Sequence, residues 1–317
     1  MKTAIITDSN SGLTRDQGQQ WGVGVVPMPV IIENETYYEG VDLFPEEFFR
    51  LLREGKNVST SQPAPEDILK LWDSALSSGY DEVLYIPMTS GLSSSCQTAL
   101  ILAADYGGRV QVADNHQISV PQKNAVQDAL ALAEAGLSAK EIKARLEAVG
   151  MDSLIYIGVD TLEYLKKGGR VTPAAAMGTV LGIKPLLTIK GEKLDTFAKV
   201  RGTKQCKARL MEAMKKSVAE YRSRGWDIRV DAAGSFDRRE EEAEWRALAA
   251  EAFPGEPIQY NPLTLSVASH TGPGAFAMGI SRRVLPDGAG RARSQCATQC
   301  PTGGSTKIRR PRCTSAP

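Results

Sequence analysis

The chain of 317 residues is poor in the residues that disulfide frameworks and metal sites require. It contains two histidines and five cysteines. Cys96 and Cys206 lie far apart, while Cys296 and Cys300 have no second Cys pair or His beside them to complete a zinc site. We therefore expect neither a disulfide framework nor a metal centre, and no cofactor.

Long apolar runs are also absent. No segment reaches the roughly 18 consecutive apolar residues that suggest a membrane helix, so we expect no stable membrane insertion. The start, MKTAIITDSNSG, has a short apolar run and lacks the cleavage pattern of a signal peptide, so it is interpreted as a first strand. With 42% hydrophobic and 24% charged residues, the composition is typical of a globular protein, and we expect a cytoplasmic one.

The end of the chain differs from the rest. Residues 286–317 contain one large aliphatic residue, Ile308, and carry six Arg or Lys against one acid, Asp287. The segment is thus +5, which leaves −4 for the body because the whole chain is +1. A basic tail can bind nucleic acid, which keeps that class open for the tail alone. Its composition favours a disordered basic tail, and we expect no nucleic acid on the body.

Short apolar strands alternate with helical patterns through the first half of the chain. The expected strands are 4–7, 25–32, 83–88 and 110–113. The expected helices are 45–53, 66–77, 97–104, 125–135 and 138–149. This alternation predicts an N-terminal α/β domain, residues 1–153, with an open, parallel-rich sheet and helices on both faces.

Strand pairs dominate the second half. The expected strands are 154–159, 184–189, 194–200 and 228–232, and the expected helices are 204–221 and 238–252. Gly191 lies in the tight turn expected between two of these strands. The pattern predicts a C-terminal α+β domain, residues 154–285, with a largely antiparallel sheet.

Small hydroxyl residues gather in TSGLSSSC, residues 89–96, between a strand and a helix. Helix N-termini carry unpaired amides and a partial positive charge, so this loop can bind a carboxylate or a phosphate. A serine N-cap is the simpler alternative. No Lys follows Gly91 as a phosphate loop requires, and Ser95 replaces the second glycine of a nucleophile elbow.

Seven segments together resemble the DegV family of bacterial fatty-acid-binding proteins. They are TDSNSGL, STSQP, SGLSSSCQTA, YLKKGGRV, GIKPLL, KVRGTKQ and SHTGPGAF, in this order over about residues 3–285. The resemblance implies two α/β domains with one long-chain fatty acid buried between them. It also implies a binding protein without enzymatic activity, which presents the acid to a separate fatty acid kinase for phosphorylation with ATP.

The resemblance also indicates site residues. The positions that match the family's carboxylate site, or lie close to it in the sequence, are Thr60, Ser61, Ser90, Ser93, Arg170 and His270. Arg201 matches a basic position that helps to dock the kinase. Residues 177–183 are expected to line an apolar tunnel or to form plain core.

The sequence departs from the family at two places. Ser94-Ser95-Cys96 stands where the family favours Gly-Thr-Tyr, and Pro121-Gln122-Lys123 stands where it favours glycines. These departures affect the predicted anion site and the start of a ligand-facing helix. The alternative function is a small-molecule enzyme, either a Ser-dependent esterase or a phosphotransferase.

Overall fold

The computed structural model describes residues 1–170, 182–191 and 193–286, and Met1–Val284 form one compact unit. The expected tail, apart from residue 286, lies outside the described residues, as does 177–181 of the expected tunnel segment. Within the described ranges, no helix has the length and apolar character needed to cross a membrane.

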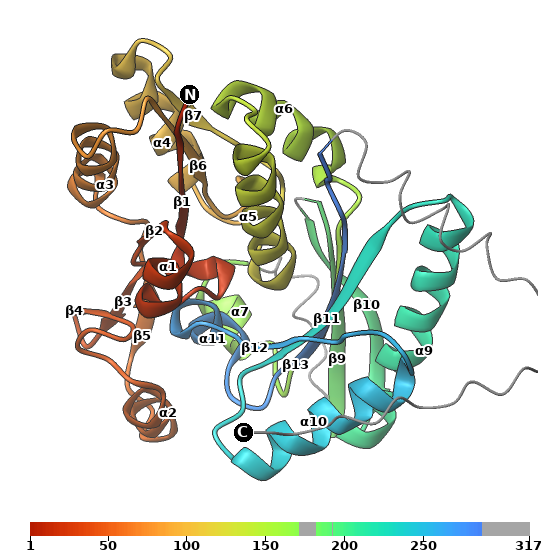
Figure 1. The fold of residues 1–317 in the computed structure, drawn as a ribbon. Coiled ribbons are helices and arrows are strands. Elements are labelled where there is room, and N and C mark those ends of the chain that lie inside the picture. The colour runs from red at the N-terminus through yellow and green to blue at the C-terminus, as the bar shows by residue number, and fades with distance from the viewer. Residues whose placement is uncertain (171–181, 192, 287–317) are drawn as a thin grey trace, which may run out of the picture. The chain divides into compact units, whose positions relative to one another are not determined.

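A four-stranded parallel sheet forms the centre of the N-terminal half, in the order β2-β1-β6-β7 (Figure 1). Its strands are β1 (Thr3–Asp8), β2 (Val23–Val26), β6 (Glu82–Ile86) and β7 (Val110–Val112). The helices that cover it are α3 (Pro65–Ser77), α4 (Ser95–Ala103), α5 (Ser119–Glu134) and α6 (Ala139–Gly150). Ile5 packs with α5 and α6, whereas Ile6 packs with α3 on the other face. Both faces are therefore covered, as the alternating pattern predicts.

A second, three-stranded antiparallel sheet follows β2 in the chain. Its order is β4-β3-β5, and its strands are β3 (Pro29–Ile32), β4 (Glu35–Tyr38) and β5 (Val58–Thr60). The prediction of one strand over 25–32 was therefore wrong. Proline has no amide proton for a sheet ladder, so the chain leaves the first sheet at Pro27 and enters the second at Pro29.

Shorter elements complete this half. They are η1 (Ser9–Ser11), α1 (Arg15–Trp21), α2 (Pro45–Arg53) and η2 (Ala104–Tyr106). The predicted helix start at Ser138 is confirmed, because its hydroxyl accepts from Glu141 N and the Glu141 carboxylate accepts from Ser138 N. Helix α5 begins at Ser119, earlier than the predicted 125, because Pro121 lies in the first turn, where its missing amide proton is tolerated.

The C-terminal half is built on a six-stranded sheet in the order β10-β9-β8-β13-β11-β12. Its strands are β8 (Leu154–Gly158), β9 (Ile183–Lys190), β10 (Lys193–Arg201), β11 (Ile228–Gly234), β12 (Tyr260–Pro262) and β13 (Phe276–Arg282). Every neighbouring pair is antiparallel except β11 with β12. The predicted hairpin turn is confirmed, with Gly191 at φ +61°.

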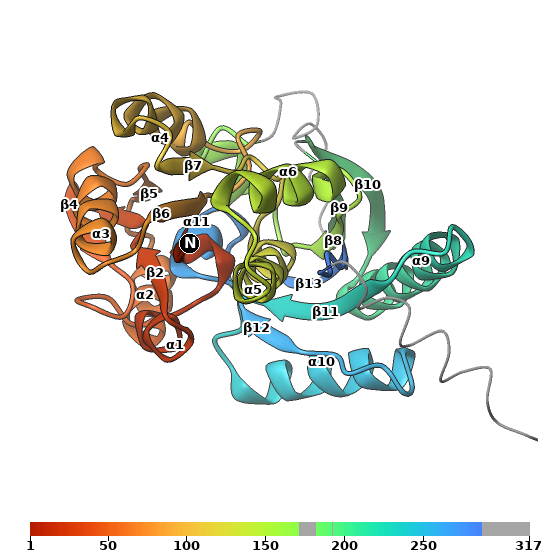
Figure 2. The ribbon, with the colours of Figure 1, turned by 45° about the horizontal axis from the view of Figure 1, so that its top comes forward.

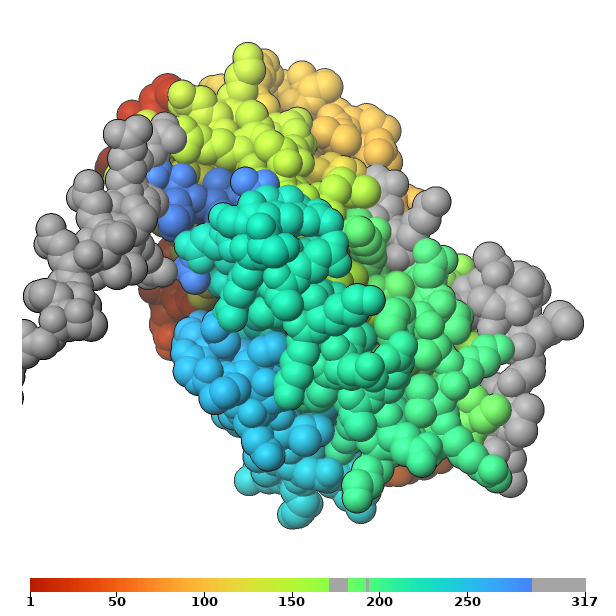
Figure 3. All heavy atoms as spheres, turned by 90° about the vertical axis from the view of Figure 1, so that its right-hand side faces the viewer, coloured from red at the N-terminus to blue at the C-terminus, as the bar shows by residue number. Residues whose placement is uncertain are grey.

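The two faces of this sheet pack against different parts of the protein. Leu154 and Tyr156 of β8 pack against α9 (Thr203–Ser223), on the side that α10 (Arg239–Ala252) also covers (Figures 2 and 3). Ile155 and Ile157 point to the opposite face because side chains alternate along a strand. That inner face turns toward the N-terminal half, with α7 (Glu163–Lys167) and α11 (Leu265–Thr271) nearby (Figure 1).

Helix α5 lies between the two halves (Figure 2) and connects them through buried polar contacts. Asn124 Nδ2 donates to Asp231 Oδ2 at 2.8 Å and to Ser281 Oγ at 2.9 Å. Arg229 forms a two-bond pair with Asp128 of α5. The fold class is confirmed, with a parallel N-terminal sheet and a mostly antiparallel C-terminal sheet. The boundary at 153 and 154 stays a prediction; it falls between α6 and β8.

Candidate functional site

A cavity of about 650 Å³ lies where the two large sheets face each other. One wall comes from loops that follow β1, β2, β6 and β7, so it lies at the carboxyl edge of the parallel sheet. The other wall is the inner face of the antiparallel sheet, with Ile155, Ile157 and Leu187. Ligands in open α/β sheets usually bind at this edge, and the volume is typical of small-molecule sites.

All six residues predicted for the carboxylate site line this cavity. They are Thr60, Ser61, Ser90, Ser93, Arg170 and His270. Thr60 and Ser61 come from the end of β5, and the other two serines come from the loop between β6 and α4. Arg170 follows α7, and His270 lies in the last turn of α11. Arg201, at the end of β10, is exposed and is not among the lining residues.

His270 is held in place by its neighbours. Its Nε2 lies 2.8 Å from Thr60 Oγ1, while its Nδ1 is buried without a hydrogen-bond partner among the described residues. A side chain at Gly168 would overlap Nδ1, so only glycine fits there. The pKa of His270 is lowered to about 4, mainly by burial and to a smaller extent by the charge of Arg170. The ring is therefore neutral at pH 7.

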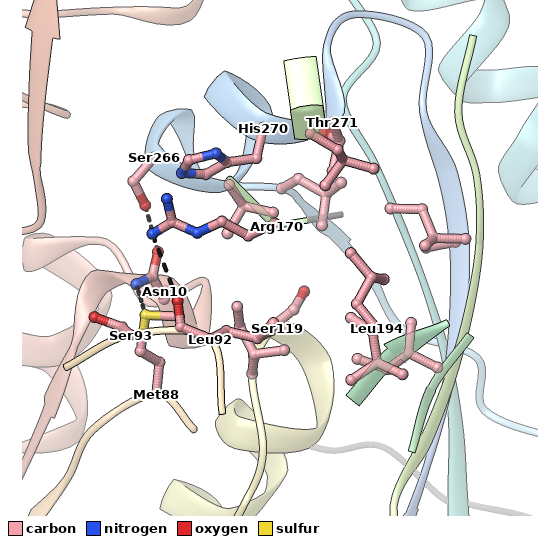
Figure 4. Close-up of a pocket in the computed structure, with 18 of the residues that line it drawn as sticks. Asn10, Met88, Leu92, Ser93, Ser119, Arg170, Leu194, Ser266, His270 and Thr271 are labelled. Atoms are coloured by element: carbon pink, nitrogen blue, oxygen red, sulfur yellow. Dashed lines mark hydrogen bonds between the residues drawn. The ribbon is translucent and has the colours of Figure 1, made fainter. Parts of the chain in front are cut away.

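Arg170 brings the one positive charge among the described lining residues. Its guanidinium donates to the carbonyls of Gly168 and Leu92, the latter at 3.5 Å, and pairs with no carboxylate of the described chain. Figure 4 shows it between the His270 ring and Leu92 with Ser93. Burial lowers its pKa below the usual value, but an arginine stays charged at pH 7. The charge is therefore available to an anion in the cavity.

The hydroxyl-rich loop does not simply cap helices. Ser94, the N-cap of α4, makes no side-chain cap bond, and Ser93 Oγ instead accepts from Ser95 N at 3.2 Å. A serine therefore occupies the N-cap position, as the alternative expects, but its hydroxyl makes no cap bond. The hydroxyls of residues 59–63 do not cap α3 either, because Ala64 is its N-cap. Since Ser93 only accepts in this bond, its hydroxyl proton has no acceptor among the described residues and is available to a ligand.

A polar network that the sequence did not predict supports this end of the cavity. Asn10 Oδ1 accepts from Ser266 Oγ and from Thr264 Oγ1, while Asn10 Nδ2 lies 2.8 Å from Met88 Sδ (Figure 4). These contacts join residues far apart in the chain, so no local pattern could reveal them.

Glu39 fixes the start of α11 from outside the cavity. Its Oε2 accepts from Leu265 N at 2.8 Å. Burial raises the pKa of Glu39 to about 7, and the bond from Leu265 opposes the shift. The helix that carries His270 thus begins at a carboxyl group that titrates near neutral pH.

Apolar side chains form the rest of the cavity wall. They include Met28, Met88, Ile118, Val120, Ile155, Ile157, Val159, Leu187, Ile189 and Leu194. Of the departures from the family pattern, Ser94 lines the cavity, whereas Pro121-Gln122-Lys123 does not. Gln122 instead bonds Thr7, Asp8 and Ile86. In the described ranges, no three His, Cys, Asp or Glu side chains are placed to hold a metal ion.

Comparison with known proteins gives consistent matches along most of the chain. The family model described as "Uncharacterised protein, DegV family" matches residues 2–283. A DegV domain-containing protein of Deinococcus radiodurans is 33% identical over 282 residues, which cover 88% of this chain and 98% of that protein.

Solved structures agree with the sequence matches. A DegV family protein from Thermus thermophilus, described for its fatty acid binding, is 33% identical with a TM-score of 0.78. The match covers 89% of this chain and all of that one. A fatty acid binding DegV family protein from Streptococcus agalactiae is 28% identical with a TM-score of 0.77, covering 89% and 99% of the two chains. This chain therefore belongs to the DegV family.

Proposed function

We propose that this protein binds a long-chain fatty acid in the cavity and presents it, without chemistry of its own, to a partner kinase that forms the acyl phosphate with ATP. The observation that carries the proposal is the asymmetry of the lining. Among the described lining residues, one charged side chain, Arg170, and several hydroxyls lie at one end, and apolar side chains form the wall beyond them. The description of the relatives from Thermus and Streptococcus as fatty acid binding supports the same ligand.

The polar end meets the needs of a carboxylate. A buried carboxylate must be paired or hydrogen-bonded, and it can only accept hydrogen bonds. Thr60 must then donate to the ligand, while its oxygen accepts from His270 Nε2–H. Ser93 and Arg170 add donors, and Ser61 and Ser90 lie in the same part of the lining. This chain of bonds gives the neutral His270 a positioning role, with its proton on Nε2.

The apolar wall suits the hydrocarbon chain. Removing a methylene from water gains roughly 0.8 kcal/mol, so a long acyl chain supplies most of the binding free energy. The polar end then orients the acid and selects it over uncharged lipids. A small hydroxy compound would leave most of this wall without contacts.

Arg201 is proposed as part of the docking surface for the kinase. It ends β10 on the surface and does not line the cavity. We assign this role because Arg201 matches a docking position of the family. A docking residue must be exposed, as Arg201 is. A solvated surface charge without a partner is the alternative.

The enzyme alternative draws on the Thr60–His270 pair, since a hydroxyl beside an imidazole is the geometry of an activated nucleophile. Such an imidazole is normally oriented by a third group, and His270 Nδ1 has none among the described residues. Mass spectrometry of an organic extract of the purified protein tests the proposal: we expect a fatty acid near one per chain. Turnover of a chromogenic ester that is lost on Thr60→Ala or Ser93→Ala would support the esterase instead.

A further inference from the structure

Ser119 places a hydroxyl on the apolar part of the cavity wall. It is the first residue of α5 and lies between Ile118 and Val120, which are 7% and 3% exposed and belong to the hydrophobic cluster around the cavity. Figure 4 shows its oxygen directed into the space between Arg170 and Leu194. The hydroxyl therefore faces the cavity from α5, whereas the six residues of the carboxylate site come from other elements.

The other hydroxyls that line the cavity are paired or belong to its polar end. Thr60 bonds His270, Ser266 donates to Asn10, and Thr271 Oγ1 donates to the Gly272 carbonyl at 3.4 Å. The lining hydroxyls at the polar end whose side chains make no bond to described residues are Ser61, Ser90 and Ser94. On the apolar wall, Ser119 has no hydrogen-bond partner among the described residues. The side chain is half-buried and lines the cavity, so its hydroxyl is open to the ligand space and is a candidate to contact the ligand.

The backbone of Ser119 gives a second reason to assign it a role. Its φ is +58°, in the left-handed region that residues other than glycine, Asn and Asp rarely adopt. Glycine would adopt this conformation without strain. Strained residues are typical of ligand sites, and here the strained residue is also the one on the apolar wall whose hydroxyl has no partner among the described residues.

We propose that Ser119 hydrogen-bonds an oxygen on the hydrocarbon chain of the ligand, and that the preferred ligand is a hydroxylated long-chain fatty acid. This inference rests on the proposed function of the cavity. A serine hydroxyl both donates and accepts, so it matches a ligand hydroxyl in either direction. Arg170 and Ser93 bind the carboxylate of the ligand, whereas Ser119 binds the hydroxyl on its chain.

The test measures two affinities on delipidated protein. Each ligand competes against a fluorescent fatty acid. The ligands are stearic acid and a set of hydroxystearic acids that carry the hydroxyl near the carboxyl, in the middle or near the methyl end. For the wild type, we expect one isomer to bind at least as tightly as stearic acid. Ser119→Ala should weaken that isomer roughly tenfold, because its hydroxyl is then buried without a partner. The affinity for stearic acid should stay within about twofold, which also shows that the variant is folded.

Two further variants make the result specific. Ser119→Gly removes the hydroxyl and accepts the left-handed backbone, so it should reproduce Ser119→Ala. Ser93→Ala should weaken both ligands alike, because both carry the carboxylate. The inference is overturned if the wild type rejects every hydroxystearic acid, or if neither Ser119 variant changes the ratio of the two affinities. If the wild type binds no fatty acid at all, the proposed function fails as well.

Discussion

Thr60 and His270 lie 210 positions apart in the chain, yet Thr60 Oγ1 is 2.8 Å from His270 Nε2. The pair joins the end of β5 to the last turn of α11 at the polar end of the cavity. The bond fixes the position of the Thr60 hydroxyl, which is the feature a carboxylate clamp needs. The polar end therefore depends on how the small antiparallel sheet packs against α11.

The clamp predicts a loss of affinity when either hydroxyl is removed. Thr60→Ala or Ser93→Ala should weaken fatty acid binding by roughly 1.5–3 kcal/mol, about tenfold or more, since each removes a hydrogen bond to a charged group. Isothermal titration of delipidated proteins measures the effect. Ser59→Ala is a matched control on the same strand, because Ser59 is exposed and does not line the cavity. Wild-type affinity in both clamp variants would place the carboxylate elsewhere.

Arg170 should select the charged head group over an uncharged one. Arg170→Met removes the positive charge and keeps much of the apolar stem, so stearic acid should bind roughly tenfold more weakly or worse. The affinity for stearyl alcohol should change little, because the alcohol carries no charge for the guanidinium to neutralise. Competition of both lipids against one fluorescent probe gives the two affinities. An equal loss for the acid and the alcohol would show that Arg170 supports the fold of this end rather than binding the carboxylate.

Glu39 predicts a pH-dependent stability. Its folded-state pKa of about 7 lies above the ordinary 4.5, so its contribution to stability is complete below pH 4.5 and is lost as pH rises through 7. Glu39→Gln keeps an acceptor for Leu265 N and removes this titration. The variant should therefore gain free energy of unfolding relative to the wild type between about pH 4.5 and 7, by on the order of 2–3 kcal/mol.

Urea unfolding of both proteins at several pH values measures that difference. Asp8, whose pKa burial raises to about 6, titrates in both proteins and cancels in the comparison. A difference that does not change with pH would mean that Glu39 is not the group that titrates.

Arg201 should separate lipid binding from transfer to the kinase. Arg201→Ala should retain a full complement of fatty acid, because the residue is outside the cavity lining, yet support little acyl-phosphate formation with a cognate kinase and ATP. Arg239→Ala, exposed at the start of α10, should leave both properties unchanged. Unchanged acyl-phosphate formation in Arg201→Ala would contradict the docking role. Loss of the lipid would show that Arg201 is needed for lipid binding or for the fold.

Local sequence signals predicted the long elements well and the short ones poorly. The capping box at Ser138 and the turn at Gly191 are confirmed, because each depends on neighbouring residues alone. Strand β13 was missed although it is central in its sheet, since Gly279 interrupts its apolar pattern and its pairing with β8 and β11 is long-range. His270 lies in a helix that starts before the SHTGPGAF segment, so that segment alone does not reveal the helix.

The site was predictable only where a resemblance supplied it. The structure gathers the six expected residues around one cavity, but composition and spacing alone suggested no more than an anion near Ser93. The Asn10–Ser266 bond spans 256 positions and has no local signature. Ser119 was also missed, because only the fold shows that it lies with Ile118 and Val120 on the apolar cavity wall.

A crystal structure with a fatty acid that carries bromine on its terminal carbon would show whether and how the acid lies in this cavity, because anomalous scattering locates the bromine independently. We expect a carboxylate within hydrogen-bond distance of Thr60 and Ser93 and beside Arg170, with the bromine among the apolar side chains on the Leu194 side. A bromine beside Arg170, or a ligand bound outside this cavity, would contradict it.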